Sequence, residues 1–96
     1  MSESSLNRPA YKAKAGSIEL TAWANESDDG VVNHVTYLTR SYRLPPEKRD
    51  GADDDGWRKT NSLRKGDLLA AAEMLRLAHL RISVLEVINR LNAMED

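Results

Sequence analysis

The C-terminal stretch from Leu68 to about Ala93 constrains the fold most, because its apolar residues recur every three or four positions, the period of an α-helix. These residues form two stripes. The first stripe contains Leu68, Ala71, Leu75, Ala78, Ile82 and Leu85, and the second contains Leu77, Leu80, Val84, Ile88 and Leu91. One stripe is enough to cover one face of a sheet, so the second stripe predicts an additional apolar contact.

The simplest partner for the second stripe is the same helix of a second copy, in an antiparallel or crossed pair. We therefore predict that its five residues form the interface of a homodimer. The alternative is a kink near Ser83, after which the last turns fold back onto the same sheet. The small size of the chain favours the dimer, because a domain of 96 residues buries only a modest core and this one has no cysteine for a disulfide.

Three stretches before the helix have the character of β-strands. Residues 18–24 alternate apolar and polar side chains, and residues 31–43 are rich in Val, Thr and Tyr. The turn-forming residues 25–30 between them predict a hairpin. Two prolines then end the second strand, and a β-like pattern resumes over residues 57–63 after a charged loop. A fourth short strand would come from residues 10–14 or from the loop residues 44–50.

Residues 1–14 are polar, contain Pro9 and show no periodicity, so we predict a flexible N-terminal tail followed by a single domain over residues 15–96.

At the other end of the sheet, Asp67 directly precedes the helical pattern. A carboxylate in this position can accept hydrogen bonds from free backbone N–H groups, which predicts that Asp67 caps or opens the helix.

Opposite charges are segregated along the chain, although the net charge is only −1. Acidic residues cluster in the two loops, at residues 26–29 and 47–55. The segments 31–43 and 57–65 contain no acidic residue. Their basic residues are Arg40, Arg43, Arg58, Lys59, Arg64 and Lys65. This distribution predicts a basic surface on neighbouring strands.

Aromatic and hydroxyl side chains alternate with these cations, a combination that suits single-stranded nucleic acid. Cations neutralise phosphates, and an aromatic ring offers a face on which an unstacked base can lie. We predict that phosphates contact Arg40, Arg43, Arg58, Lys59 and Arg64. Bases would stack on Trp57 and Tyr42, with Trp23 joining them if it lies on the same face. The alternative is a half-exposed sheet whose outer face is charged for solubility alone.

The sequence contains no arrangement of residues typical of an enzyme. His34 and His79 are far apart, and no nucleophile set, phosphate-binding glycine loop or zinc-protease motif is present. Residues 50–56 resemble the start of a calcium loop but lack its distal Glu. We therefore predict no enzymatic activity, metal, cofactor or small-molecule substrate. The sequence has neither a long apolar run nor a signal peptide, which predicts a cytoplasmic protein that does not bind membranes.

The segment Gly56-Trp57-Arg58-Lys59-Thr60-Asn61-Ser62-Leu63-Arg64-Lys65-Gly66-Asp67-Leu68 resembles the last strand and the helix start of the positive cofactor four (Whirly-like) single-stranded DNA-binding fold. Residues 16–25 and 31–43 are similar to earlier strands of that fold in order and spacing, so the resemblance covers residues 15–85. It implies a curved antiparallel sheet followed by one long helix, and a homodimer formed largely through that helix. It also implies cations at Arg58 and Lys59 of the last strand and at Arg40 and Arg43 of the strand before, with Trp57 as a stacking aromatic.

The sequence thus predicts an α+β fold, with a curved antiparallel sheet of three to four strands followed by one long C-terminal helix. The predicted function is sequence-independent binding of single-stranded DNA or RNA by a homodimer, in transcription, replication or repair. The alternative is a protein-interaction adaptor whose strand edge or helix stripe binds a protein and which has no nucleic-acid ligand.

Overall fold

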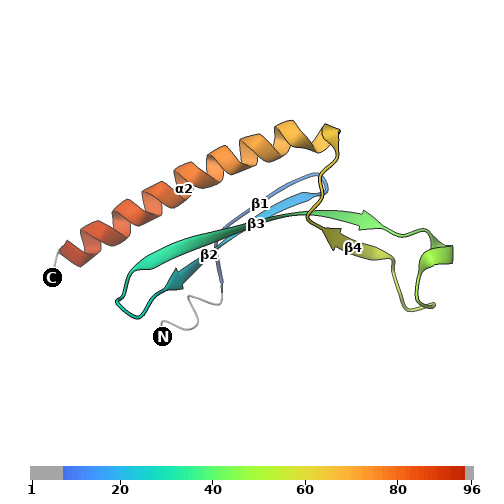
Figure 1. Cartoon of the computed structure of the whole chain (residues 1–96), viewed down its shortest axis with the longest axis horizontal. Helices are drawn as coiled ribbons and strands as arrows, with labels where there is room; N and C mark the ends of the chain where they lie inside the picture. The colour runs from blue at the N-terminus through green and yellow to red at the C-terminus, as the bar shows by residue number, and fades with distance from the viewer. Residues whose placement is uncertain (1–7, 95–96) are drawn as a thin grey trace.

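Four strands and one long helix make up the computed structural model, which describes residues 8–94 (Figure 1). The strands are β1 (Pro9–Ala15), β2 (Ile18–Glu26), β3 (Val32–Arg43) and β4 (Trp57–Thr60), and the helix is α2 (Leu68–Met94). Short 3-10 helices, η1 (Pro46–Lys48) and η2 (Lys65–Asp67), lie in the β3–β4 loop and before α2. The strands form one antiparallel sheet in the order β1-β2-β3-β4. The predicted α+β fold is therefore confirmed, with four strands.

The fourth strand comes from the N-terminal part of the chain. Residues 10–14, the first of the two predicted sources of a fourth strand, belong to β1, so the assignment of residues 9–14 to a flexible tail is corrected. Residues 1–7 lie outside the described part of the chain. In β1, Tyr11, Ala13 and Ala15 pack against the core, while Lys12 and Lys14 alternate with them and are exposed. Residues 44–50 form a loop with η1 instead of a strand.

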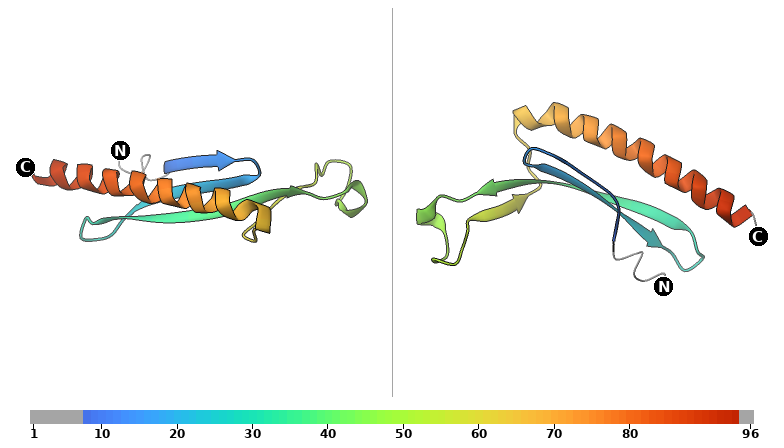
Figure 2. Two further views of the ribbon diagram at one scale, coloured as in Figure 1. Left: turned by 90° about the horizontal axis from the view of Figure 1, so that it is seen from above. Right: turned by 180° about the vertical axis from the view of Figure 1, so that it is seen from behind.

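The helix covers only one face of the sheet (Figure 2). Leu20, which is fully buried, and Ile18 from β2 pack against Met74 and Ala78 of α2. Leu38 lies opposite Leu20 in the β2–β3 register and adds to this cluster. The molecule measures 60 × 31 × 17 Å, with a radius of gyration of 17.4 Å. A compact domain of this length would have about 12–13 Å, so the core is thin.

The helix is continuous through Ser83, so the alternative, a fold-back of its last turns onto the sheet, is not present. Ala71, Met74 and Ala78 form the side of the helix that packs on the sheet, whereas Leu75 is 46% exposed. The buried face of the helix is therefore rotated about the helix axis relative to the predicted first stripe. Small alanines allow the helix backbone to approach the strands closely, which explains the rotation. The five residues of the second stripe are 40–56% exposed.

Asp67 opens the helix, one of its two predicted roles, as the last residue of the turn η2 that leads into α2. The Asp67 carboxylate accepts a hydrogen bond of 3.0 Å from the Arg64 backbone N–H. The backbone N–H of Asp67 donates in return to the Arg64 carbonyl at 2.9 Å. These two contacts close the turn η2, from which α2 continues.

We expect Leu20→Ala to lower the free energy of unfolding by about 2–5 kcal/mol, because it removes the central side chain of a thin core and leaves a cavity. Urea unfolding followed by circular dichroism measures this change. Leu69→Ala is the control, since Leu69 is 86% exposed and its truncation should change stability by less than about 0.5 kcal/mol. Equal effects of the two substitutions would contradict this description of the core.

Candidate nucleic-acid interface

The face of the sheet opposite α2, which we call the free face, combines basic and aromatic side chains. Side chains alternate along each strand, so the register assigns residues to this face. The free face carries Lys12, Lys14, Glu19, Thr21, Trp23, Val35, Tyr37, Thr39, Ser41, Arg43, Trp57 and Lys59. Its four cations and one carboxylate give this surface a net charge of 4 − 1 = +3, although the whole chain has a net charge of −1.

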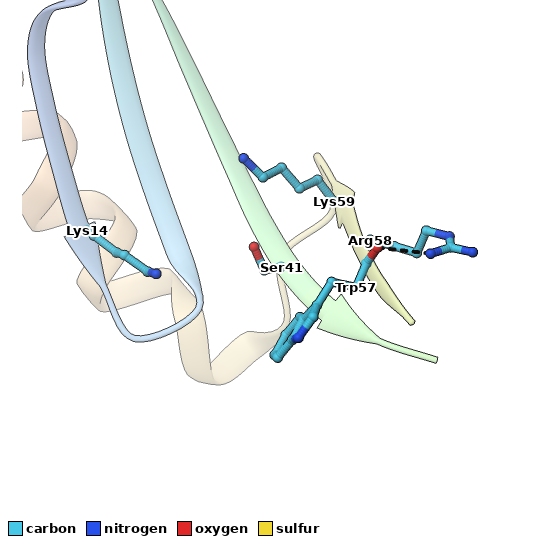
Figure 3. Close-up of a pocket in the computed structure, with 5 residues that line it drawn as sticks. All are labelled: Lys14, Ser41, Trp57, Arg58 and Lys59. Carbon is cyan, nitrogen blue, oxygen red and sulfur yellow. Dashed lines mark hydrogen bonds between the residues drawn. The ribbon is translucent and has the colours of Figure 1, made fainter. Parts of the chain in front are cut away.

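A hollow of about 470 Å³ opens on the part of the sheet where β4 joins β3. It is lined by Lys14, Ser41, Trp57, Arg58 and Lys59. Figure 3 shows Lys14 reaching from β1 toward Ser41 and Trp57, with Lys59 on the other side of Ser41. The hollow is therefore lined by one aromatic ring, Trp57, and by lysines from the two edge strands.

Trp57 is 54% exposed and is held in place from one side. The Arg43 guanidinium lies 5.7 Å from the centre of the indole ring, within the range of a cation–π contact. Arg43 Nε also donates to the Asp55 carbonyl at 2.8 Å, and the Trp57 backbone N–H donates to the Asp55 carboxylate at 3.0 Å. This geometry gives an ordered, solvent-accessible ring on which a flat group could stack.

Glu19 is the only acidic residue on the free face of the four strands, and it neutralises part of the positive charge. Its carboxylate lies 3.3 Å from Lys59 Nζ and 3.5 Å from Lys12 Nζ. The hydrogen bond from Lys59 is the main reason that the pKa of Glu19 is below its ordinary value, and Lys12 adds to the effect. The ion pairs are exposed, so a phosphate could compete with Glu19 for both lysines.

Arg58 belongs to the predicted site, but its charge is bound by the β3–β4 loop. Its guanidinium donates two hydrogen bonds to the Asp54 carboxylate, at 2.7 and 3.1 Å, and lies 3.9 Å from Asp50. The Asp54 hydrogen bond raises the pKa of Arg58. Figure 3 shows the guanidinium turned away from the hollow, with a hydrogen bond to the Trp57 carbonyl.

Arg40 and Tyr42 lie on the opposite face from Trp57, because they are three positions and one position away from Arg43 in β3. Arg40 Nε donates to the Ser62 carbonyl at 3.0 Å, and its guanidinium lies 5.7 Å from the Tyr42 ring. The side chain of Arg40 is only 14% exposed. Arg64 is exposed but lies at the start of the helix, 3.7 Å from Asp67.

The structure therefore brings together Arg43, Trp57 and Lys59 from the predicted site and separates them from Arg40, Tyr42 and Arg64. Arg58 lines the same hollow, but its guanidinium is turned away from it. It adds Lys12, Lys14 and Ser41, which were not assigned to the site from the sequence. The alternation of Lys12 and Lys14 with apolar residues is the signal that could have identified β1 and its outer face.

Within residues 8–94, no three His, Cys, Asp or Glu side chains are grouped so that they could hold a metal ion. The helices of this part of the chain are too short or too polar to cross a membrane. Compared with known proteins, the chain matches no family model, no curated protein and no solved structure.

The Asp54–Arg58 pair predicts an acid-resistant loop. The Arg58 hydrogen bonds, together with those from the Asp50 and Gly56 backbone N–H groups, hold the pKa of Asp54 far below its ordinary value of 3.8. A depressed pKa means that this stabilisation is complete above pH 3.8 and is lost only as the pH falls through the lower value. We expect an NMR titration to show the Asp54 carboxylate still ionised at pH 3, and Asp54→Asn to loosen the loop at neutral pH. A midpoint near 3.8 would contradict the pairing.

Proposed function

We propose that this protein binds single-stranded nucleic acid across the free face of its sheet, without sequence specificity and without enzymatic activity. The observation that carries the proposal is the exposed Trp57 ring, which lines the same hollow as Lys14 and Lys59. Ammonium groups bind phosphates of any sequence, and every base has a flat face that can stack on an indole. The chemistry of this face therefore suits a single strand whose bases are turned toward the protein.

A single strand fits this surface better than a duplex does. The basic and aromatic groups lie on one broad sheet face, whereas readout of duplex DNA commonly uses a helix in the major groove. The arginines of α2 do not form such a surface: Arg76 is paired with Glu73 at 2.6 Å, and Arg81 and Arg90 lie on different sides of the helix. The free face also carries Trp23 and Tyr37, which could stack additional bases.

Membership of the positive cofactor four (Whirly-like) fold is part of the same proposal. The confirmed topology, four antiparallel strands followed by one long C-terminal helix, supports it. A role in transcription, replication or repair would follow from this membership, and we propose separately that the protein acts in the cytoplasm. The binding residues that we propose differ from those implied by the resemblance, because Arg58 and Arg40 are engaged in contacts within the chain.

Fluorescence anisotropy of a labelled oligo-dT of about 20 nucleotides tests the binding, since this length exceeds the site of a typical single-strand binder. We expect Trp57→Ala to weaken binding about 5- to 150-fold, the equivalent of about 1–3 kcal/mol for one stacked base. Trp57→Phe is the matched control, because it keeps an aromatic face and should lose less affinity. If Trp57→Ala binds as tightly as the unmodified protein, the stacking role is wrong.

The cations are tested by the salt dependence of the same binding. We expect Lys14→Ala/Lys59→Ala to reduce the slope of log K against log salt by about 1.4, since each phosphate contact on a single strand contributes about 0.7. Arg64→Ala is the control, because Arg64 is a basic residue outside the free face. A larger loss with Arg64→Ala than with the lysine pair would contradict the assignment of the site. Repeating the titration with oligo-U compares RNA with DNA.

We also propose that the protein acts as a homodimer through the second stripe of α2. The exposed side chains of Leu77, Leu80, Val84, Ile88 and Leu91 support this contact. If they bound another protein instead, the adaptor alternative would apply and the purified chain would not associate through this stripe.

We expect Leu80→Glu/Leu91→Glu to halve the mass of the assembly in light scattering, because two carboxylates per copy would have to be buried at the contact. Leu69→Glu is the control: Leu69 is equally apolar and 86% exposed, but it lies two turns before the stripe. An unchanged mass of the double variant would show that the stripe does not join two copies.

A further inference from the structure

One edge of the sheet is open over most of β3. This strand pairs with β2 from Val32 to Arg40, but with β4 only from Arg40 to Arg43. The side of β3 that faces away from β2 therefore has no neighbouring strand over residues 32–39. In the described part of the chain, no other strand covers this edge.

The direction of the free backbone groups follows from two hydrogen bonds. The Ser41 N–H donates to the Ser17 carbonyl on the β2 side, and the Leu44 N–H donates to the Gly56 carbonyl on the β4 side. Successive residues of a strand point in opposite directions, so the even-numbered residues point away from β2. The groups directed to the open edge are the N–H and C=O of Val32, His34, Thr36 and Leu38. No hydrogen bond found within residues 8–94 uses these groups.

The exposed sides of the edge strands β1 and β4 carry features that discourage pairing with another chain, and the open part of β3 does not. The edge strand β1 has Pro9, an irregular register after it, and two exposed lysines. The edge strand β4 is four residues long and carries Arg58 and Lys59. In contrast, residues 32–39 contain no proline, no Asp, Glu, Lys or Arg, and a regular register with β2. Tyr37 is 57% exposed in this stretch.

We propose that the open edge of β3 pairs antiparallel with the same edge of a second copy, centred on Val35. In this register Val32 lies opposite the partner's Leu38, His34 lies opposite the partner's Thr36, and the two Val35 residues face each other. It is the register in which all four outward-pointing residues of each copy pair with one another. The segment is self-complementary because it brings no acidic or basic residues face to face, and β4 already occupies the remainder of the edge.

This pairing would join the two sheets into one, with both helices on one side and both free faces on the other, because the two-fold axis is perpendicular to the sheet. Trp57 lies opposite Arg43, eight residues from Val35. At about 3.3 Å per residue, the two Trp57 sites would be about 50 Å apart and on the same face. The contact goes beyond the proposed function: it needs neither a nucleic-acid ligand nor the helix stripe. A homodimer joined through the stripe would keep two open β3 edges, so the two contacts together would give assemblies of more than two copies.

A cysteine introduced at the centre of the pair tests both the contact and its register. The chain has no cysteine, so Val35→Cys provides a single thiol. Directly opposed residues of a non-hydrogen-bonded antiparallel pair have Cα atoms about 4.5 Å apart, within the range of a disulfide. With oxidised glutathione as the oxidant, we expect Val35→Cys to form a covalent dimer on a non-reducing gel. Tyr37→Cys is the control, because its partner cysteine would be about 13 Å away along the strand, and it should remain monomeric on the gel.

Absence of the Val35→Cys dimer, or equal cross-linking of both variants, would overturn the proposal.

A charge at the same position provides a test that does not depend on thiol chemistry. This test uses the Leu80→Glu/Leu91→Glu variant, in which the helix stripe cannot join two copies. With Val35→Thr added, we expect light scattering to give two copies per particle. With Val35→Lys added, we expect one copy, because two ammonium groups would lie directly opposite each other. Circular dichroism verifies that both variants fold. One copy in both cases would overturn the β3 contact, while oligo-dT binding by the same proteins tests the proposed function separately.

Discussion

The packing of α2 on one face of the sheet determines the rest of the structure. Leu20 and Ile18 are buried against Met74 and Ala78, and one helix can cover only one face of the sheet. The opposite face therefore remains in water, and polar and charged side chains occupy it without a desolvation cost. Because only one helix packs on the sheet, the core is thin and an apolar stripe remains exposed on the outer side of the helix. The candidate site and the candidate contacts between copies are thus consequences of one two-layer arrangement.

Charge is organised locally in a chain whose net charge is nearly zero. Asp54 holds Arg58 in the β3–β4 loop, and Glu19 links Lys12 to Lys59 on the free face. The two carboxylates differ in how firmly they hold the cations that they bind. The Asp54 pair is bidentate and supported by backbone N–H groups, so it orders the loop next to Trp57. The Glu19 pairs are exposed and single, so they leave the lysines able to exchange one anion for another.

Periodicity in the sequence was sufficient to predict β2, β3, β4 and the helix. It left β1 undecided: residues 10–14 were one of two candidates for a fourth strand, because Pro9 and the two lysines also made this half-exposed edge strand look like a polar tail. For the site, alternation along a strand separates Arg40 from Arg43, but the sequence does not reveal which of them faces the helix. Which of the two arginines faces the helix depends on the register of β2 with β3 and on the packing of the α2 alanines against the sheet. Contacts such as that of Arg40 with Ser62 arise only when the chain has folded.

The central claim is that a single strand lies on the free face, and a map of the contact surface tests it most directly. The measurement is a set of two-dimensional amide NMR spectra of the labelled protein during titration with oligo-dT. The account predicts that shifts concentrate at Lys12, Lys14, Ser41, Trp57 and Lys59 and at the Trp57 indole N–H, while α2 changes little. Shifts concentrated on α2, or none at saturating protein and DNA concentrations in low salt, would contradict it.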